Sequence, residues 1–256
     1  MRSLIAFLKK EFSEQLRSGR LTVLGILFVI FGIMNPAVAK LTPWLLETMS
    51  ESLEESGMTV TAVTVDALTS WTQFFKNIPM MLIAYVLVYA NLFTREYEAG
   101  TLLLVLTKGV QRYKIVLSKA LWLILFWTIG YFYCFGITYG YNAYYWDNSI
   151  AKSLMPAIMY WYVFSLLVIC LMVLFSVLSN SSSMVMLGTG SVVVVFYLLG
   201  LYPKITDYLP TSLMNGTAIV IGAASASNYY GALWITLALC VIALTCSIPL
   251  MNKKQL

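Results

Sequence analysis

The sequence predicts an all-α integral membrane protein with six transmembrane helices, and three observations support that fold class. Hydrophobic residues make up 60% of the 256-residue chain, charged residues only 11%, and the mean hydropathy is +0.82. Soluble domains carry about 25% charged residues. Apolar segments of roughly the length that crosses a bilayer recur along the chain. Most basic residues fall in segments that would lie on one side of the membrane. We therefore expect residues 1–256 to form a single transmembrane domain.

Residues 1–20 are predicted to form an N-terminal amphipathic helix that lies in the membrane interface. Apolar and basic residues alternate there with helical spacing, and Gly19 marks the end of the pattern. A basic amphipathic helix before a hydrophobic span usually lies among lipid headgroups. The alternative is a signal peptide, with Ala37–Ala39 supplying the small residues of a cleavage site. We favour a first transmembrane helix, because the apolar run 21–39 exceeds the roughly 7 to 15 residues of a signal-peptide core.

The transmembrane helices are predicted at residues 21–39, 77–93, 120–141, 153–178, 184–202 and 232–251. The acidic stretch 40–75 is expected outside the cell, as a short helix followed by a threonine-rich connection. Pro79 fits the first turn of the second span, where a missing N–H costs little. Gly188–Ser191 is not followed by a lysine. We interpret this run as small residues that let helices approach closely, and not as a phosphate-binding loop.

The loop 95–119, between the second and third spans, is the only long charged segment between two strongly apolar ones. Glu96 and Glu98 precede Gly100 and Thr101, a leucine-rich turn follows, and the pattern stops at 107–109. Acidic residues in a first turn and a Lys-Gly pair at the end are start and stop signals of a helix. We predict a short amphipathic helix that lies against the membrane.

This loop resembles the cytoplasmic loop of type-2 ATP-binding cassette (ABC) export permeases. In that family the loop holds a coupling helix, which docks into a groove of a separate ATPase subunit. The resemblance covers the whole length and segment count of the chain, and its N-terminal helix resembles the elbow helix of these permeases. Gly109 and Val110 stand where many members have a proline. The resemblance implies that coupling residues of this chain are Glu96, Glu98, Gly100, Thr101, Leu104, Thr107 and Arg112.

Residues 203–231 are expected to form an extracellular re-entrant segment before the last helix. Pro203 and Pro210 interrupt this stretch, and its apolar run 213–226 is shorter than a span. The string Leu209–Leu213 also resembles the re-entrant segment of the same permease family. A seventh crossing would carry Lys253 and Lys254 to the outside, against the charge distribution of the chain.

The distribution of lysine and arginine predicts that both termini are cytoplasmic. With six spans, four of the 16 basic residues fall outside, namely Lys40, Lys76, Lys152 and Lys204. The remainder fall inside: Arg2, Lys9, Lys10, Arg17, Arg20, Arg95, Lys108, Arg112, Lys114, Lys119, Lys253 and Lys254. Cytoplasmic loops carry such an excess of positive charge. We therefore expect a multi-pass protein of the cell (cytoplasmic) membrane.

The composition also excludes several kinds of chemistry. The chain has no histidine, so catalysis by imidazole and zinc binding through imidazole are both excluded. Its cysteines lack Cys-x-x-Cys spacing and lie in apolar runs, so we expect small core residues and no metal site. The predicted spans contain no Asp, Glu, Arg or His, which argues against a proton antiporter. No Walker lysine loop is present, so the chain is not expected to hydrolyse ATP itself.

These features together predict the membrane subunit of an ATP-driven ABC exporter. The expected assembly has two copies of an ABC ATPase subunit and a second permease, identical or homologous, surrounded by membrane lipid and without nucleic acid. No cofactor is expected in this chain, because ATP and Mg would bind the partner ATPase. Apolar, aromatic and hydroxyl-bearing spans suit a hydrophobic or amphipathic substrate such as a peptide, lipid or drug, although its contact residues are unknown. The alternatives are a channel or sodium-coupled carrier and, less favoured, a membrane-embedded enzyme.

Overall fold

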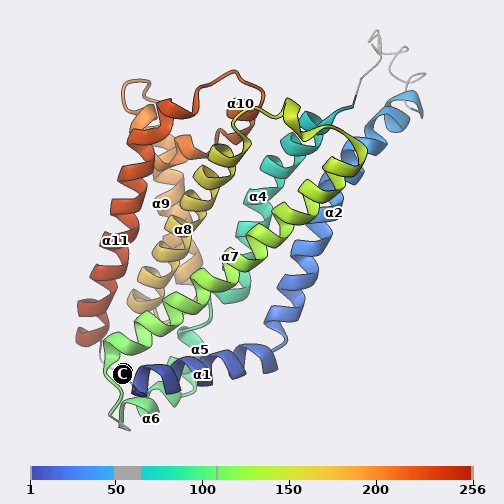
Figure 1. The fold of residues 1–256 in the computed structure, drawn as a ribbon. Coiled ribbons are helices and arrows are strands. Elements are labelled where there is room, and N and C mark those ends of the chain that lie inside the picture. The colour runs from blue at the N-terminus through green and yellow to red at the C-terminus, as the bar shows by residue number, and fades with distance from the viewer. Residues whose placement is uncertain (1, 49–64, 108, 255–256) are drawn as a thin grey trace.

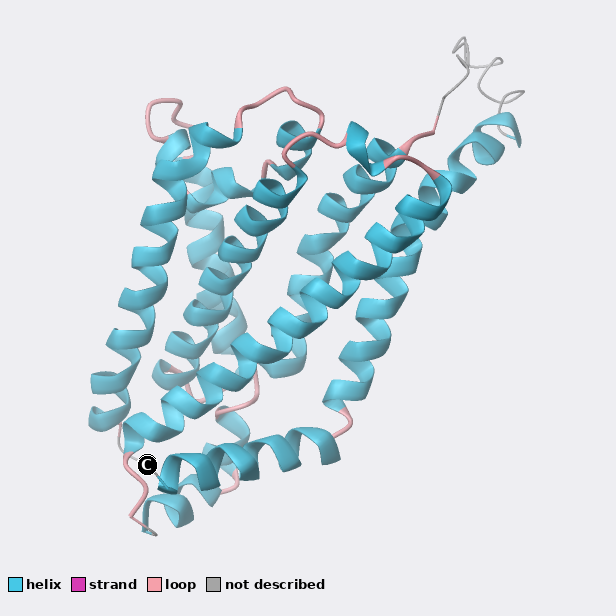
Figure 2. Ribbon diagram, viewed as in Figure 1, coloured by secondary structure: helices cyan, strands magenta, loops and turns pink. Residues whose placement is uncertain are grey.

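The structure is a computed structural model of the chain, and it describes residues 2–48, 65–107 and 109–254. Within these ranges the chain is helical and contains no strand. The α-helices are α1 (Arg2–Arg17), α2 (Arg20–Thr48), α4 (Ala67–Tyr89), α5 (Thr94–Glu98), α6 (Thr101–Thr107), α7 (Arg112–Tyr145), α8 (Leu154–Leu178), α9 (Ser182–Leu199), α10 (Gly216–Val220) and α11 (Tyr230–Lys253). Figure 2 shows that loops join them only at the two ends of the bundle.

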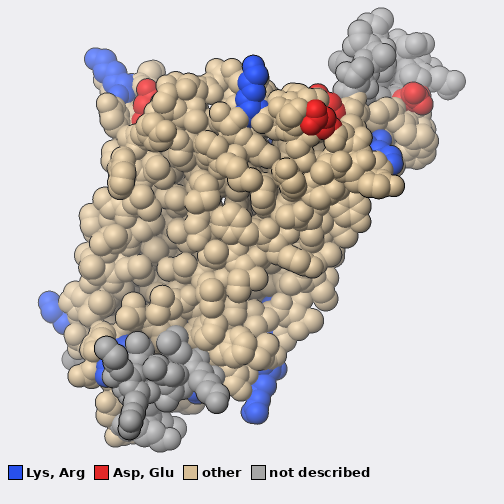
Figure 3. Space-filling view, in the orientation of Figure 1, with Lys and Arg blue, Asp and Glu red and all other residues tan. Residues whose placement is uncertain are grey.

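The predicted fold class is confirmed. Six helices of the described chain are long and apolar enough to cross a membrane, namely α2, α4, α7, α8, α9 and α11. They run side by side, and α1 lies crosswise at one end of the bundle, which we call the α1 end (Figure 1). On the face shown in Figure 3, the charged side chains lie toward the two ends and leave an uncharged band between them. Such a band is what the hydrocarbon core of a bilayer requires.

Several helices extend beyond the predicted spans. Helix α2 continues to Thr48 through the region predicted to begin a separate extracellular helix, and the threonine-rich connection falls largely in 49–64, outside the described residues. Helix α4 begins at Ala67 because Asp66 caps it, accepting a hydrogen bond from the Thr69 backbone N–H at 3.0 Å. Pro79 therefore lies inside the helix and not in its first turn. A hydropathy pattern locates the apolar part of a helix and not its polar ends.

A proline inside α2 is compensated by a polar network between helices. Pro36 has no N–H, so the carbonyl of Gly32 loses its normal helical partner. The hydroxyl of Thr138 on α7 donates to that carbonyl at 3.0 Å and accepts from the Asn35 side chain at 3.0 Å. Asn77 on α4 donates to Asn35 at 2.7 Å. The network satisfies a freed backbone group where no water is available, and it connects three helices.

Helix α8 lies at the centre of the bundle, and α9 lies at its edge. In its most apolar stretch α8 is 72% buried, whereas α9 is 11% buried. A Cβ on Gly188 of α9 would lie 2.4 Å from the ring of Phe175, so this glycine allows the close approach that the sequence predicted. Nothing lies within 4 Å of a Cβ on Gly190, so only part of the small-residue run serves that purpose. The apolar outer face of α9 is left for lipid or a partner.

The chain between α9 and α11 contains only short helices: η2 (Thr206–Tyr208), η3 (Pro210–Met214), α10 and η4 (Ala226–Tyr229). Among the described residues it makes no further crossing, because α9 ends and α11 begins at the end opposite α1 (Figure 1). It is fixed to α8 by the Tyr160 hydroxyl, which donates to the Ala226 carbonyl at 2.8 Å. A Cβ on Gly216 would collide with Phe75 and Trp161, so the segment also packs closely on α4 and α8.

Candidate functional site

The connection between α4 and α7 forms two short helices at the α1 end, where the sequence predicted one. Helix α5 ends at Glu98 and α6 begins at Thr101, with Gly100 between them at φ +64°. Because L side chains rarely adopt that conformation, glycine permits the turn that separates the helices. Glu96 and Glu98 therefore belong to α5, and the leucine-rich turn belongs to α6. Helix α7 begins at Arg112, earlier than the predicted third span.

The structure separates the predicted coupling residues into two groups. Glu98, Gly100, Thr101 and Thr107 are exposed at the α1 end. Glu96 and Arg112 contact other parts of the same chain, as described below. The side chain of Leu104 lies outside the described residues. The exposed group lies at the surface, where a partner protein can reach it, whereas Glu96 and Arg112 are bound to other helices of this chain.

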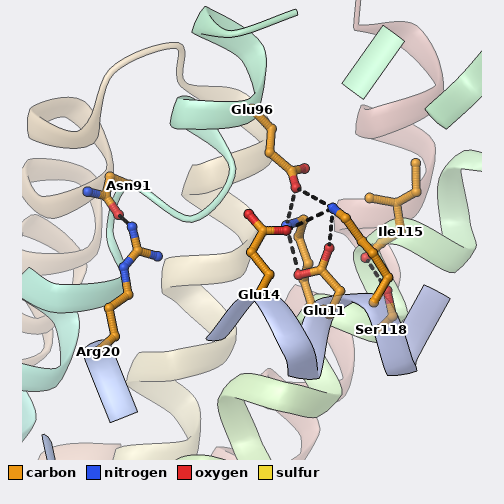
Figure 4. A network of polar contacts seen from close by, with 9 residues as sticks. Glu11, Glu14, Arg20, Asn91, Glu96, Ile115 and Ser118 are labelled. Atoms are coloured by element: carbon orange, nitrogen blue, oxygen red, sulfur yellow. Dashed lines mark hydrogen bonds and ion pairs between the residues drawn. The ribbon is translucent and has the colours of Figure 1, made fainter. Parts of the chain in front are cut away.

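Glu96 belongs to an ionic cluster formed by Lys10, Glu11 and Glu14 of α1, Glu96 of α5 and Lys119 of α7. The Lys119 ammonium lies 3.2 Å from Glu11 Oε2 and 3.1 Å from Glu96 Oε1. Lys10 lies 2.9 Å from Glu14, 3.4 Å from Glu96 and 3.5 Å from Glu11. Figure 4 shows the three carboxylates converging from α1 and α5. The cluster therefore ties the crosswise helix and the α4–α7 connection to the start of a long helix.

The cluster is buried at its centre, which makes its pairing important. Lys119 is 1% exposed and Glu11 is also 1% exposed. A buried charge is costly unless it is paired, so each of these groups depends on the others. At the edge, burial alone would raise the pKa of Glu14, but the hydrogen bond from Lys10 and the charges of Lys10, Lys119 and Arg95 lower it. The outer pair stays ionised at neutral pH and supports the inner one.

The three carboxylates are close enough together to ligate one cation. Their nearest oxygen atoms lie within 4.8 Å of one another. Two ammonium groups already contact these oxygens, and hard cations such as Mg²⁺ and Ca²⁺ would have to displace them. The arrangement is therefore a structural junction of opposite charges.

Arg112 fastens the start of α7 to the end of α11. Its guanidinium donates to the carbonyls of Met251 at 2.8 Å, Asn252 at 3.1 Å and Lys254 at 2.7 Å. The last carbonyls of a helix lack intrahelical partners and carry partial negative charge, so an arginine there stabilises the end. Lys254 in turn donates to Val177 and Ser179 at the end of α8, each at 2.8 Å. The coupling role predicted for Arg112 stays a prediction, and in the structure its guanidinium holds the end of α11.

Replacing Arg112 with glutamine is expected to destabilise the purified chain by about 1.5 to 3 kcal/mol, the range for hydrogen bonds to a charged group. Arg112→Lys is expected to recover much of this loss, because all three contacts come from one guanidinium nitrogen, Nη1, and an ammonium can also donate to several carbonyls. The measurement is thermal unfolding in detergent, with Lys114→Gln, two residues further along α7, as a control of the same charge change. Equal stability of Arg112→Gln and the control would contradict the capping role.

Sequence reasoning missed Glu11, Gln15 and Lys119, yet a signal for the first two was present. On a helical wheel Glu11 and Gln15 fall on the same face as Leu4 and Leu8, in the middle of the apolar side of α1. A carboxylate in that position needs a buried partner. Lys119 directly precedes the apolar run that begins at residue 120, and it was expected at the membrane rim. Its burial follows from the crossing of α1 over α7, which no local pattern reveals.

An apolar pocket of about 360 Å³ lies among α4, α8 and α9. Its walls include Ile83 and Val86 of α4, Phe164 of α8 and Gly190 of α9. Trp161, also in the wall, is 3% exposed, and its indole N–H has no hydrogen-bond partner in the described structure. Buried indole groups usually find an acceptor. The pocket can hold an apolar molecule, and the unpaired indole N–H belongs to a residue of its wall.

Comparison with models of known protein families gives a match. A protein-family model described as "ABC-2 family transporter protein" matches residues 5–230, which run from within α1 to the first residue of α11. A search of curated proteins finds no match.

Proposed function

The chain belongs to the ABC-2 family of transporter proteins, and we propose that it is the membrane subunit of an ATP-driven exporter. Members of this type are transmembrane permease subunits and not the ATPase itself. The proposed assembly contains two ABC ATPase subunits, which bind ATP and Mg, and two permeases, identical or homologous. Family membership supports an ATPase partner in general. The direction of transport, the copy numbers and the coupling contacts are parts of the proposal.

The proposal places the α1 end in the cytoplasm of the cell membrane, with both termini on that side. The excess of lysine and arginine in the segments at this end supports the orientation. The short segment between α9 and α11 would then be extracellular and re-entrant. Helix α1 would lie in the headgroup layer of the inner leaflet.

The observation that carries the proposal is the attachment of α5 and α6 to the rest of the molecule. These two short helices lie beyond the end of the long helices (Figure 1). Through Glu96, α5 is joined to the buried Lys119 of α7 and to Lys10 of α1. A force applied to α5 by an ATPase would reach a transmembrane helix through these ion pairs. The exposed Glu98 and Thr101 would meet the ATPase, while Glu96 transmits the movement.

Copurification tests this assignment. The chain expressed alone is expected to show no ATPase activity, because it lacks nucleotide-binding motifs. Expressed with its ABC ATPase partner, it is expected to form a complex of two permeases and two ATPase subunits, measurable by native mass spectrometry. Recovery of a stable, transport-active chain without any ATPase would overturn the proposal and would favour a channel or carrier.

The apolar pocket supports a hydrophobic or amphipathic substrate. It lies among helices whose neighbouring faces are exposed and apolar, including Ile83 and Leu87 of α4 and Val194 of α9. A second permease seated against these faces would close the pocket from lipid. The pocket wall has hardly any polar surface and no ionisable side chain, so a bare ion would gain nothing there.

Gly190→Leu is expected to reduce transport at least tenfold while the protein still folds. Open space surrounds the position of a new Cβ, so the larger side chain enters the pocket without colliding with neighbours. The matched control is Gly136→Leu on α7, another helical glycine with no atom within 4 Å of a new Cβ. Transport into inverted vesicles and ATPase coupling should be measured for both variants at equal expression. Normal transport by Gly190→Leu would remove this pocket from the substrate path.

A further inference from the structure

A second pocket, at the α1 end, has the composition of a ligand site and is not explained by coupling. We call it the headgroup pocket; it has a volume of about 350 Å³ and lies between the end of α1, the start of α2 and the α5–α6 connection. Three arginines line it, namely Arg17, Arg20 and Arg95. Glu14, Gln15 and Glu96 line it as well. The pocket therefore presents both cationic and acceptor groups.

The three arginines have no ion-pair partner within the described part of the chain. The guanidinium of half-buried Arg20 donates to the Asn91 side chain at 2.8 Å, a neutral acceptor (Figure 4). Glu14, which lines the same pocket, offsets part of the repulsion among these guanidinium groups, and a bound anion would offset more of it. Guanidinium donors match phosphate oxygens in geometry and charge.

Two acceptor oxygens of the same pocket lack hydrogen-bond donors. Gln15 is 3% exposed, and its Oε1 has no hydrogen-bond partner in the described structure. Glu96 Oε2 is also buried and unpartnered, although Glu96 Oε1 pairs with both lysines of the ionic cluster. A buried acceptor without a donor costs about 1 to 3 kcal/mol, so native structures normally satisfy it. Both residues line the headgroup pocket, and a ligand that donates N–H groups would satisfy both oxygens.

We propose that the headgroup pocket binds a phospholipid with a primary ammonium headgroup, its phosphate held by Arg17, Arg20 and Arg95 and its ammonium by Gln15 and Glu96. The position favours lipid over a soluble phosphate compound. Arg20 is the first residue of the first transmembrane helix, so the pocket lies where the hydrocarbon region begins. Val23, one turn along α2, is 58% exposed and offers apolar surface to an acyl chain.

The chemistry predicts a ranking of headgroups. A choline headgroup has the phosphate but no N–H donor, so it leaves Gln15 Oε1 and Glu96 Oε2 unsatisfied. A glycerol headgroup satisfies the arginines but brings no positive charge to Glu96. Phosphatidylethanolamine provides both and is expected to bind about tenfold more tightly than either, the effect of one charge-assisted hydrogen bond.

The test uses the delipidated full-length chain in detergent, titrated with phosphatidylethanolamine, phosphatidylcholine and phosphatidylglycerol of identical acyl chains. Bound lipid is counted by native mass spectrometry. Arg20→Gln and Arg95→Gln are each expected to lower the affinity for phosphatidylethanolamine about tenfold. Lys204→Gln removes one exposed charge at the end of the bundle opposite α1 and is the matched control. Arg95 is exposed, so its replacement remains informative if Arg20→Gln folds poorly.

Gln15→Leu separates the two halves of the site. It removes an unsatisfied buried acceptor, so the variant is expected to fold, and it should reduce the preference for phosphatidylethanolamine over phosphatidylcholine. Equal binding of the three lipids, or unchanged binding by both arginine variants, would overturn the proposal. Inorganic phosphate that binds alone and displaces all lipid would show a free-anion site and would also overturn it. None of these results depends on transport activity.

Discussion

Replacing Lys119 with methionine is expected to destabilise the chain by about 3 to 5 kcal/mol, the loss found when one partner of a buried ion pair is removed. Methionine fills much of the same volume, so the loss reports charge and not a cavity. Glu11 would remain buried beside α7 without its closest cation, and Glu96 would keep only Lys10. Thermal or denaturant unfolding in detergent measures the effect.

A double replacement distinguishes pairing from simple packing. If Lys119 is buried because of Glu11, then Glu11→Gln together with Lys119→Met should lose less stability than the sum of the single changes, since no uncompensated charge remains. Lys114→Met, at a half-buried position earlier on α7, serves as the control. If the two losses in unfolding free energy were strictly additive, the ion pair between Lys119 and Glu11, 3.2 Å apart, would contribute nothing to stability.

The junction also has a functional consequence beyond stability. Lys119→Met should weaken the attachment of α5 to α7, so the assembled transporter is expected to hydrolyse ATP with reduced transport per ATP. Glu11→Gln removes a charge from α1 and none from α5. It is therefore expected to destabilise the chain but to change the amount of transport per ATP less than Lys119→Met does. Comparing transport and ATPase rates for these two variants separates force transmission from folding.

The fold could be predicted from sequence because the signal for each span is local. About 20 apolar residues in succession leave few alternatives to a membrane helix. Boundaries were less predictable, since helices continue into polar residues wherever a cap or a tertiary contact permits. Asp66 caps α4, which begins ten residues before the predicted span. The Lys40 ammonium lies 3.8 Å from the centroid of the Tyr145 ring, where α2 continues past its apolar part.

The candidate site was only partly predictable, because its decisive contacts join distant residues. Lys119 and Glu11 are separated by 108 positions in the chain, and no periodicity connects them. Arg112 meets backbone carbonyls at residues 251–254, a kind of partner that leaves no mark on the sequence. Local signals worked at Gly109, near which α6 ends as predicted, but the sequence prediction missed the break at Gly100, whose positive φ separates α5 from α6.

Reversing the charge of Glu98 is expected to weaken docking of the ATPase by about 2 to 5 kcal/mol, if this carboxylate is buried against an arginine of the ATPase on assembly. Glu98 is the exposed acidic residue of α5, and Glu96 is already paired inside the chain. Membrane insertion and the stability of the isolated chain should be unchanged for Glu98→Lys, because the residue lies beyond the long helices and outside the ionic cluster.

Two controls determine what Glu98→Lys reports. Asp207→Lys reverses an exposed charge in η2, near the opposite end of the bundle, and should leave docking intact. Glu96→Lys would add a third cation to a buried cluster and is expected to unfold the α5 region, so it is unsuitable as a docking test. The alternative role of Glu98 is to favour the helix terminus, an effect of about 0.3 to 1 kcal/mol. Copurification of the ATPase and transport, both measured at equal expression, distinguish these roles. Wild-type values for Glu98→Lys would mean that α5 is not the docking surface. Lost docking with unchanged unfolding would assign the contact to this carboxylate.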